Sequence, residues 1–194
     1  MIKPGNFVVV LDSCVLFKAN VRDLLLWMAK NELYQPRWSH KICEEVSRNL
    51  INRRGLSYEK AQRLIIEMNK HFYDAIVDDY PDLNIESIDP KDGHVVATAI
   101  ASNAQVIVTD NLKHFPNEIL RKYNLEAKSS DEFMLDLLDL SRDRVIQSFK
   151  KMEEKLINPP LTRDQILEGL MKQTPVFTEQ LKKELEFGVK STLY

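Results

Sequence analysis

Four acidic side chains of this 194-residue chain have positions that could bring their carboxylates together: Asp12, Glu45, Asp92 and Asp110. At separations of about 5 Å, each pair of carboxylates repels by roughly 3 kcal/mol at an effective dielectric of about 20. A protein keeps such a cluster by protonating one acid or by binding a cation. Oxygen ligands without a nearby cysteine pair favour Mg²⁺ or Mn²⁺, which can activate water for attack on a phosphodiester. We therefore ask which elements would position these acids.

Two of the acids stand at the ends of short apolar runs. Residues 7–11 and 106–108 are apolar at every position, which is typical of strands buried on both faces of a parallel sheet. Asp12 follows the first run and Asp110 comes just after the second. Because the carboxyl ends of parallel strands lie at one edge, we expect these two acids to be neighbours.

Asp92 reaches the same edge through a helix. The segment that it opens carries an apolar inner face formed by Val95, Val96, Ala99 and Ile100. This helix must run back antiparallel to the strand at 106–108, so its first residue lies at the carboxyl edge. The topology therefore predicts that Asp92 joins Asp12.

Glu45 belongs to a helix that Ser39 can cap. Its apolar stripe consists of Ile42, Val46 and Leu50. At roughly 100° per residue, Glu45 flanks this stripe whereas Glu44 points away from it. We expect Glu45 to face inward, toward the other acids.

Each acid also has an ordinary structural explanation. Asp12 could be a turn residue, Asp92 a helix N-cap, and Glu45 a solvated acid like Glu44. Asp110 could begin a turn with Asn111. The convergence of all four on one sheet edge favours the functional interpretation.

The remaining pattern predicts an α/β domain followed by helices. A short extended piece at 34–36, a strand at 84–88 and a capping box formed by Ser129 and Glu132 complete the order β-α-α-α-β-α-β-α. Beyond about residue 140 the strand patterns end. We predict a domain over 1–140 and a helical extension over 141–194, broken at Pro159-Pro160, in which Thr162 and Thr178 cap two short helices.

Composition limits the functional classes. With 27 basic and 29 acidic residues the net charge is −2, which disfavours a general nucleic-acid coat protein. A local basic stretch at 48–63 begins beside Glu45 and includes Arg48, Arg53 and Arg54, which could position phosphates. Cys14 and Cys43 lack C-x-x-C spacing, and the apolar run near the N-terminus is short. We expect a reduced cytoplasmic protein without a membrane span.

These segments together resemble the PIN-domain family. The strand ending in Asp12-Ser13 is similar to its first motif, and Trp38-Ser39 leading to Glu44-Glu45-Val46 is similar to its second. The segments 92–99 and 106–116 resemble its third and fourth motifs. Four motifs in order, spanning about residues 7–140, make the resemblance fairly specific.

The resemblance implies a three-layer α/β/α fold with a central, mostly parallel sheet. It also implies a Mg²⁺- or Mn²⁺-dependent endoribonuclease, most similar to the VapC-like toxins of type II toxin–antitoxin systems. The implied partners are an RNA substrate, with tRNA among the candidates, and a protein antitoxin, with a homodimer as a candidate assembly.

Carried over by residue, the resemblance points to Asp12, Glu45 and Asp92. The family often places an acid or an amide at Asn111 and an Asp at the position of His114, so Asp110 and Asn111 are alternatives for the fourth ligand. His94 and His114 lie near the predicted edge and are expected to support the site or to lie at the surface rather than to bind metal. The same departure leaves the number of bound metal ions open.

Two other functions fit parts of the sequence. A haloacid dehalogenase-like phosphatase also begins with a strand that ends in Asp, but it needs a second acid where Cys14 stands. A PIN-fold module that binds RNA or protein without catalysis would retain the fold and tolerate the altered fourth motif.

Overall fold

The computed structural model describes residues 5, 7–81, 83, 85, 87–156 and 160–190, with side chains described through residue 186. Its centre is a parallel four-stranded sheet in the order β2-β1-β3-β4. The strands are β1 Val8–Leu11, β2 Gln35–Arg37, β3 Val106–Val108 and β4 Glu126–Lys128. In register, Val10 of β1 pairs with Arg37 on one side and with Ile107 on the other. The predicted α/β fold with a parallel sheet is confirmed.

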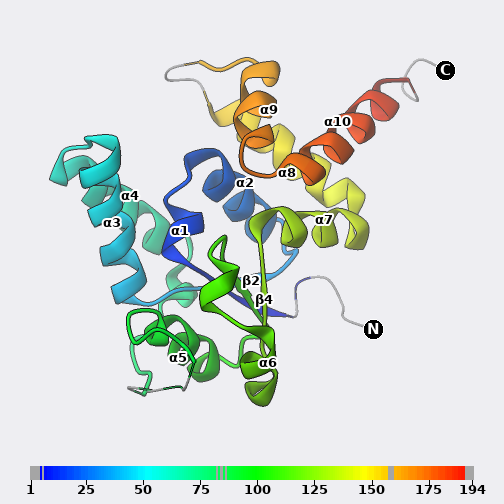
Figure 1. Ribbon diagram of the computed structural model, residues 1–194. Coiled ribbons are helices and arrows are strands. Elements are labelled where there is room, and N and C mark those ends of the chain that lie inside the picture. Colours follow the sequence, from blue (N-terminus) through cyan, green and yellow to red (C-terminus); the bar gives the residue numbers. More distant parts are fainter. Residues whose placement is uncertain are drawn as a thin grey trace.

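The connections between these strands are helical. They contain α1 Ser13–Leu16, α2 Ala19–Lys30, α3 His40–Arg54, α4 Tyr58–His71, α5 Gly93–Ala101 and α6 Asn117–Leu120, with 3-10 turns at Tyr73–Ala75, Leu112–His114 and Arg121–Tyr123. Parallel crossovers are right-handed, so a connection from β1 toward β2 and one that returns past β1 to β3 cover opposite faces. Figure 1 shows α2 and α5 on opposite sides of the strands, which gives the three layers.

Burial explains why the sequence pattern located β1 and β3. Val9, Val10 and Leu11 have no exposed surface, and all three residues of β3 are buried. Helices cover both faces of these central strands, so every position must be apolar. On α3 the apolar residues Ile42, Val46 and Leu50 are buried, and Ser39 caps the helix by accepting from the Ile42 amide.

The strand predicted at 84–88 is wrong at the residues that can be described. Residues 84 and 86 lie outside the described part of the chain, and Ile85, Ser87 and Ile88 are in no strand. Ser87 has a φ of 70°, a left-handed conformation that extended backbone excludes. The fourth strand is instead β4, where only Ala127 of the three residues is buried. An edge strand of this kind has no apolar run that a sequence pattern could reveal.

The C-terminal part is helical, as predicted, and contains α7 Ser130–Leu140, α8 Arg142–Lys155, α9 Arg163–Met171 and α10 Pro175–Lys190. Helix α8 packs along α2, and α10 packs along α7. The apolar stripes are buried against the same chain, through residues that include Val145, Phe149, Ile166, Leu170, Phe177 and Leu181. Figure 1 shows these helices gathered beside α2, away from α5 and α6. None of the described helices is both long and apolar enough to cross a membrane.

The capping predictions are confirmed at Ser129 and Thr162 and wrong at Thr178. Ser129 forms its capping box with Glu132, and Thr162 caps α9. Helix α10 begins earlier than predicted, at Pro175, whose fixed φ suits a first helical position. Thr178 is therefore buried inside the helix, where its hydroxyl donates to the Thr174 carbonyl.

A carboxylate from another helix caps α10. Asp131, the second residue of α7, accepts from the backbone amides of Val176 and Phe177 at 3.1 and 2.8 Å. These amides have no partner within their own helix, so the contact satisfies two donors and joins α7 to α10.

We predict that Asp131→Ala lowers the free energy of unfolding by about 1 kcal/mol, because a lost N-cap costs about 0.5–2 kcal/mol. Urea denaturation followed by circular dichroism measures this. The control Asp139→Ala removes an exposed acid from the same helix and should change stability by less than about 0.5 kcal/mol. Equal effects of the two variants would contradict the capping role.

Candidate active site

The acids lie where the chain changes direction through the sheet. From β1 the chain moves outward to β2, then returns past β1 to β3, so β1 and β3 are neighbours whose connections leave in opposite directions. Such a switch point opens a crevice at the carboxyl ends of the two strands. Asp12 follows β1 there, and its backbone amide donates to the Val108 carbonyl of β3 at 3.0 Å. Thr109 follows β3 in the same crevice.

Asp12 is the most enclosed of the four acids, with 6% of its surface exposed. Its Oδ2 accepts from Thr109 Oγ1 at 2.7 Å and from Cys14 Sγ at 3.1 Å. Burial and the negative charge of Asp12 raise the pKa of the Cys14 thiol to about 12, so the thiol keeps its proton and remains a donor. These donors offset the cost of holding a carboxylate out of water.

Ser13 links Asp12 to Glu45. Its hydroxyl lies 3.3 Å from Asp12 Oδ1 and donates to Glu45 Oε2 at 2.8 Å. Glu45 is partly buried whereas Glu44 is exposed, as the helical pattern predicted. Burial alone would raise the pKa of Glu45, but the contacts with His94 and Ser13 and the nearby charge of Arg48 together hold it below its ordinary value.

Asp92 lies across the cluster from Glu45. It precedes α5 but makes no side-chain capping bond, so the capping explanation does not account for its side chain. Its Oδ2 lies 2.7 Å from His114 Nδ1, and Asn111 Nδ2 lies 2.7 Å from that same nitrogen. Burial raises the pKa of Asp92 despite the contact with His114, and the negative charges of Asp12 and Asp89 add to the rise. The influence of Asp12 shows that these two carboxylates share one electrostatic environment.

Asp110 points elsewhere. Its Oδ2 pairs with Lys18 Nζ at 2.6 Å, and its Oδ1 accepts from the backbone amide and the hydroxyl of Ser130 at 2.8 Å. Both carboxylate oxygens are therefore engaged by Lys18 and by the first residue of α7.

Ser13 links Asp12 to Glu45, and Thr109 links Asp12 to the backbone amide of Asn111. The side chains of Asn111 and Asp92 meet at His114, whereas the carboxylate of Asp110 takes no part in these contacts.

Two residues border the cluster on the Glu45 side. His94 is buried, and its Nε2 lies 3.5 Å from Glu45 Oε1, while neither ring nitrogen has a hydrogen-bond partner among the described atoms. Arg48 is largely exposed and lies 3.8 Å from the same carboxylate oxygen. Arg53 and Arg54 follow near the end of α3, where the Arg54 guanidinium sits over the Phe17 ring at 5.2 Å.

The oxygen donors suit a hard divalent cation in type, since three carboxylates and one amide are available. Within the described part of the chain, no three His, Cys, Asp or Glu side chains are close enough together to form a ligand set. The donor types are those that Mg²⁺ or Mn²⁺ prefers, although these carboxylates contact Ser13, Thr109 and His114 rather than standing together as a ligand set.

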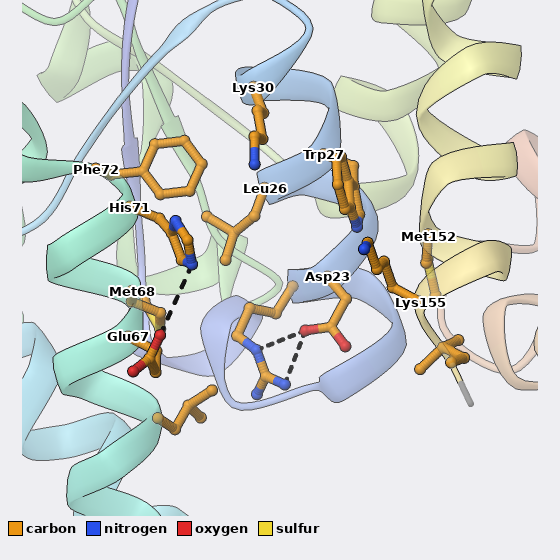
Figure 2. A pocket seen from close by; sticks show the side chains of 13 residues that line it. Asp23, Leu26, Trp27, Lys30, Glu67, Met68, His71, Phe72, Met152 and Lys155 are labelled. Atoms are coloured by element: carbon orange, nitrogen blue, oxygen red, sulfur yellow. Dashed lines mark hydrogen bonds and ion pairs between the residues drawn. The ribbon is translucent and has the colours of Figure 1, made fainter. Parts of the chain in front are cut away.

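A separate pocket of about 280 Å³ lies between α2, α4 and α8. Figure 2 shows Leu26 and Trp27 of α2 on its wall, with Met68 of α4 and Met152 of α8. Among its charged groups, Arg22 is paired with Asp23 and His71 contacts Glu67. None of the four candidate acids lines this pocket.

A comparison with known protein families shows to which family the chain belongs. The PIN domain family matches residues 8–113, which are more than half of the chain and include all four candidate acids. The chain belongs to the PIN-domain family. This confirms the resemblance drawn from the four motifs.

The C-terminal part of this PIN-domain protein matches a second family, the VapC50 C-terminal domain, over residues 130–183. A Mycobacterium tuberculosis protein named "Putative ribonuclease VapC50" is 40% identical over 98 residues. The alignment covers 50% of this chain and 58% of that relative. No solved structure matches the chain.

The contacts made by Ser13, Thr109 and His94 are the part of the site that sequence reasoning missed. Ser13 follows Asp12 and Thr109 precedes Asp110 in the sequence. Their positions beside the strand ends could therefore have indicated that they contact the acids. His94 was expected near this edge, but its contact with Glu45 was not, because only the packing of α5 against the sheet brings the two together.

We predict that Asp92→Asn stabilises the metal-free PIN domain at neutral pH. Asp92 has a raised pKa in the folded state, so folding becomes less favourable as pH rises through the interval between its ordinary pKa of 3.8 and its folded value. The amide removes this penalty while keeping an oxygen acceptor for His114. Thermal unfolding in excess chelator should show a higher Tm than wild type at pH 7 and no gain below pH 3.8.

The matched control is Asp79→Asn, which neutralises an exposed acid. This variant should show the same change in Tm between pH 7 and pH 3.8 as wild type does. A Tm for Asp92→Asn at or below that of wild type at pH 7 would contradict the electrostatic explanation.

Proposed function

We propose that this protein is a metal-dependent endoribonuclease that hydrolyses RNA phosphodiester bonds. The observation that carries this proposal is the linked set Asp12, Glu45 and Asp92, three carboxylates from three different elements at the switch point of a PIN-domain sheet. Repulsion between partly buried acids destabilises a folded protein. Such an arrangement is therefore expected where the acids have a function, such as binding a cation for hydrolysis.

The proposed cofactor is Mg²⁺ or Mn²⁺, held by Asp12, Glu45 and Asp92 with Asn111 nearby. When bound, such an ion activates water and offsets the negative charge that develops on the phosphodiester. The protein's own contribution is to orient the acids. The Thr109 hydroxyl and the Ser13 backbone amide orient the carboxylate of Asp12, and the Ser13 hydroxyl orients Glu45. Asp12, Ser13 and Thr109 are themselves buried.

Arginines of α3 are the proposed contacts with the RNA backbone. Arg48 lies beside Glu45, and Arg53 and Arg54 continue along the same helix. Guanidinium groups bind phosphate oxygens through paired N–H donors, which positions a strand without reading its sequence. Their placement would bring a phosphate of the substrate toward the acids.

We further propose that the protein acts as the toxin of a VapBC-like pair, with a protein antitoxin as its partner. The support is the similarity of half of the chain to the mycobacterial relative and of the C-terminal part to the VapC50 C-terminal domain. A tRNA is the candidate substrate to test first, and a homodimer is the candidate assembly. A cytoplasmic location accords with these proposals.

The other two functions make different predictions. A haloacid dehalogenase-like phosphatase requires a second carboxylate at position 14, where this chain has a thiol that donates to Asp12. A non-catalytic PIN-fold module would bind RNA or protein with no dependence on the acids. The following experiment separates that module from the enzyme.

We expect purified protein to cleave RNA in Mg²⁺ or Mn²⁺ and to lose activity in excess chelator. Glu45→Gln should reduce kcat/KM on the order of 100-fold, the scale for removing one electrostatic group from a catalytic site. Glu44→Gln, a matched change at the exposed neighbouring acid, should retain wild-type cleavage. Undiminished activity in chelator, or equal losses in the two variants, would refute the proposed mechanism.

Arg53→Ala tests the RNA-binding surface. It removes an exposed cation that lies about two turns beyond Glu45 on α3 and forms no ion pair with the acids of the described structure, so it should raise KM and leave kcat nearly unchanged. Binding of a single-stranded RNA measured at several salt concentrations should lose about 0.7 from its logarithmic salt slope, the value for one phosphate contact. Lys183→Ala, an exposed cation on α10, is the control and should leave the slope unchanged. An unchanged slope in Arg53→Ala would remove this arginine from the interface.

A further inference from the structure

One buried histidine has a polar ring without a hydrogen-bond partner. The side chain of His94 is 4% exposed. Within the part of the chain that the structure describes, its Nδ1 and Nε2 are the only buried side-chain nitrogen or oxygen atoms that lack such a partner. Burying a donor or an acceptor without a partner is destabilising, so such a group in a folded protein indicates a role beyond packing.

The carboxylate of Glu45 lies beside this ring. Its Oε1 is 3.5 Å from His94 Nε2, slightly farther than in an ordinary N–H···O hydrogen bond. Its other oxygen, Oε2, already accepts from the Ser13 hydroxyl at 2.8 Å. A carboxylate can accept at both oxygens, so Oε1 is the atom that a donor from His94 would reach.

A second donor near the same oxygen is exposed. The Arg48 guanidinium lies 3.8 Å from Glu45 Oε1, and the arginine side chain is 64% exposed. At these distances the oxygen is shared loosely between a buried imidazole and an exposed guanidinium. Binding of Arg48 to an RNA phosphate, as proposed above, would draw the guanidinium away and leave His94 beside Oε1.

Packing fixes the imidazole more firmly than the arginine. His94 belongs to the first turn of α5, in which residues 93–99 are all buried. This helix contacts β1 and β3, the two strands that border the crevice. A side chain locked by packing on a helix holds its position, whereas an exposed one can change partners. His94 is therefore placed to hold the carboxylate of Glu45 while Arg48 moves.

We propose that His94 is a positioning residue for Glu45, and that its Nε2 donates to Glu45 Oε1 when Arg48 turns to the RNA backbone. The carboxylate is then held at both oxygens, by Ser13 and by His94. This inference rests on the ribonuclease activity proposed above. It adds the residue that fixes the orientation of Glu45 while RNA is bound.

Cleavage of a single-stranded RNA by the full-length protein tests this role through two amide substitutions. The amide nitrogen of His94→Gln lies near the position of Nε2, whereas that of His94→Asn lies near the position of Nδ1. We expect His94→Ala and His94→Asn to lower kcat on the order of tenfold with little change in KM, because a misplacement of about 1 Å can cost up to about 100-fold. His94→Gln should recover most of this loss, whereas a histidine with only a structural role would be replaced equally well by either amide.

His71→Asn is the matched control, because it makes the same change at a 59% exposed histidine at the end of α4. It should retain the wild-type kcat. Nuclear magnetic resonance of the imidazole gives a readout that is independent of activity. In excess chelator, single-stranded RNA should move the Nε2 proton signal of His94 downfield in wild type, as expected for an N–H that donates to a carboxylate, but not in Glu45→Ala.

A wild-type kcat in folded His94→Ala, or equal kcat values for the Gln and Asn variants, would overturn the inference. A His94 signal that RNA leaves unchanged in wild type would overturn it as well, and this measurement decides alone if circular dichroism shows the variants to be unfolded. Absence of RNA cleavage by wild type would reject the proposed function. Intact wild-type cleavage together with any of the contrary results would reject only the role of His94.

Discussion

The constraint on which this structure depends is the repulsion among three carboxylates, those of Asp12 after β1, Glu45 on α3 and Asp92 before α5. Asp12 is nearly enclosed, and its negative charge contributes to the raised pKa of Asp92. Hydrogen-bonding groups offset this repulsion. Thr109 and Ser13 contact the carboxylate of Asp12, and His114 contacts the carboxylate of Asp92. The neighbours of the acids are therefore fixed almost as strictly as the acids themselves, because removing a donor would leave a partly buried charge uncompensated.

The sheet topology supplies the location, and the helical extension is anchored to it. Asp110, next to Thr109 at the end of β3, holds the first residue of α7. The following residue, Asp131, holds the first turn of α10. The carboxylates of Asp110 and Asp131 thus connect the end of β3 to α7 and α7 to α10. The match to the VapC50 C-terminal domain begins at residue 130, the start of this anchored segment.

Elements buried on both faces or marked by local chemistry could be predicted from the sequence. Strands β1 and β3 were visible as apolar runs, and the Ser39, Ser129 and Thr162 caps were visible as local patterns. Strand β4 was not, because an edge strand buries only one of its three side chains. The start of α10 was also misplaced, since its cap is a side chain 45 residues away in sequence.

For the site, the sequence by itself determined which acids stand at strand ends and helix starts, because connectivity and periodicity are local properties. It predicted that Glu45, rather than Glu44, faces inward, and the structure agrees. Only the tertiary structure shows that Asp110 and Asn111, which follow the same strand, make different contacts. The carboxylate of Asp110 binds Lys18 and Ser130, which are distant in sequence, whereas the side chain of Asn111 contacts His114. Pairwise contacts between distant segments leave no periodic trace in the chain, and the partners of a charged group have to be seen in space.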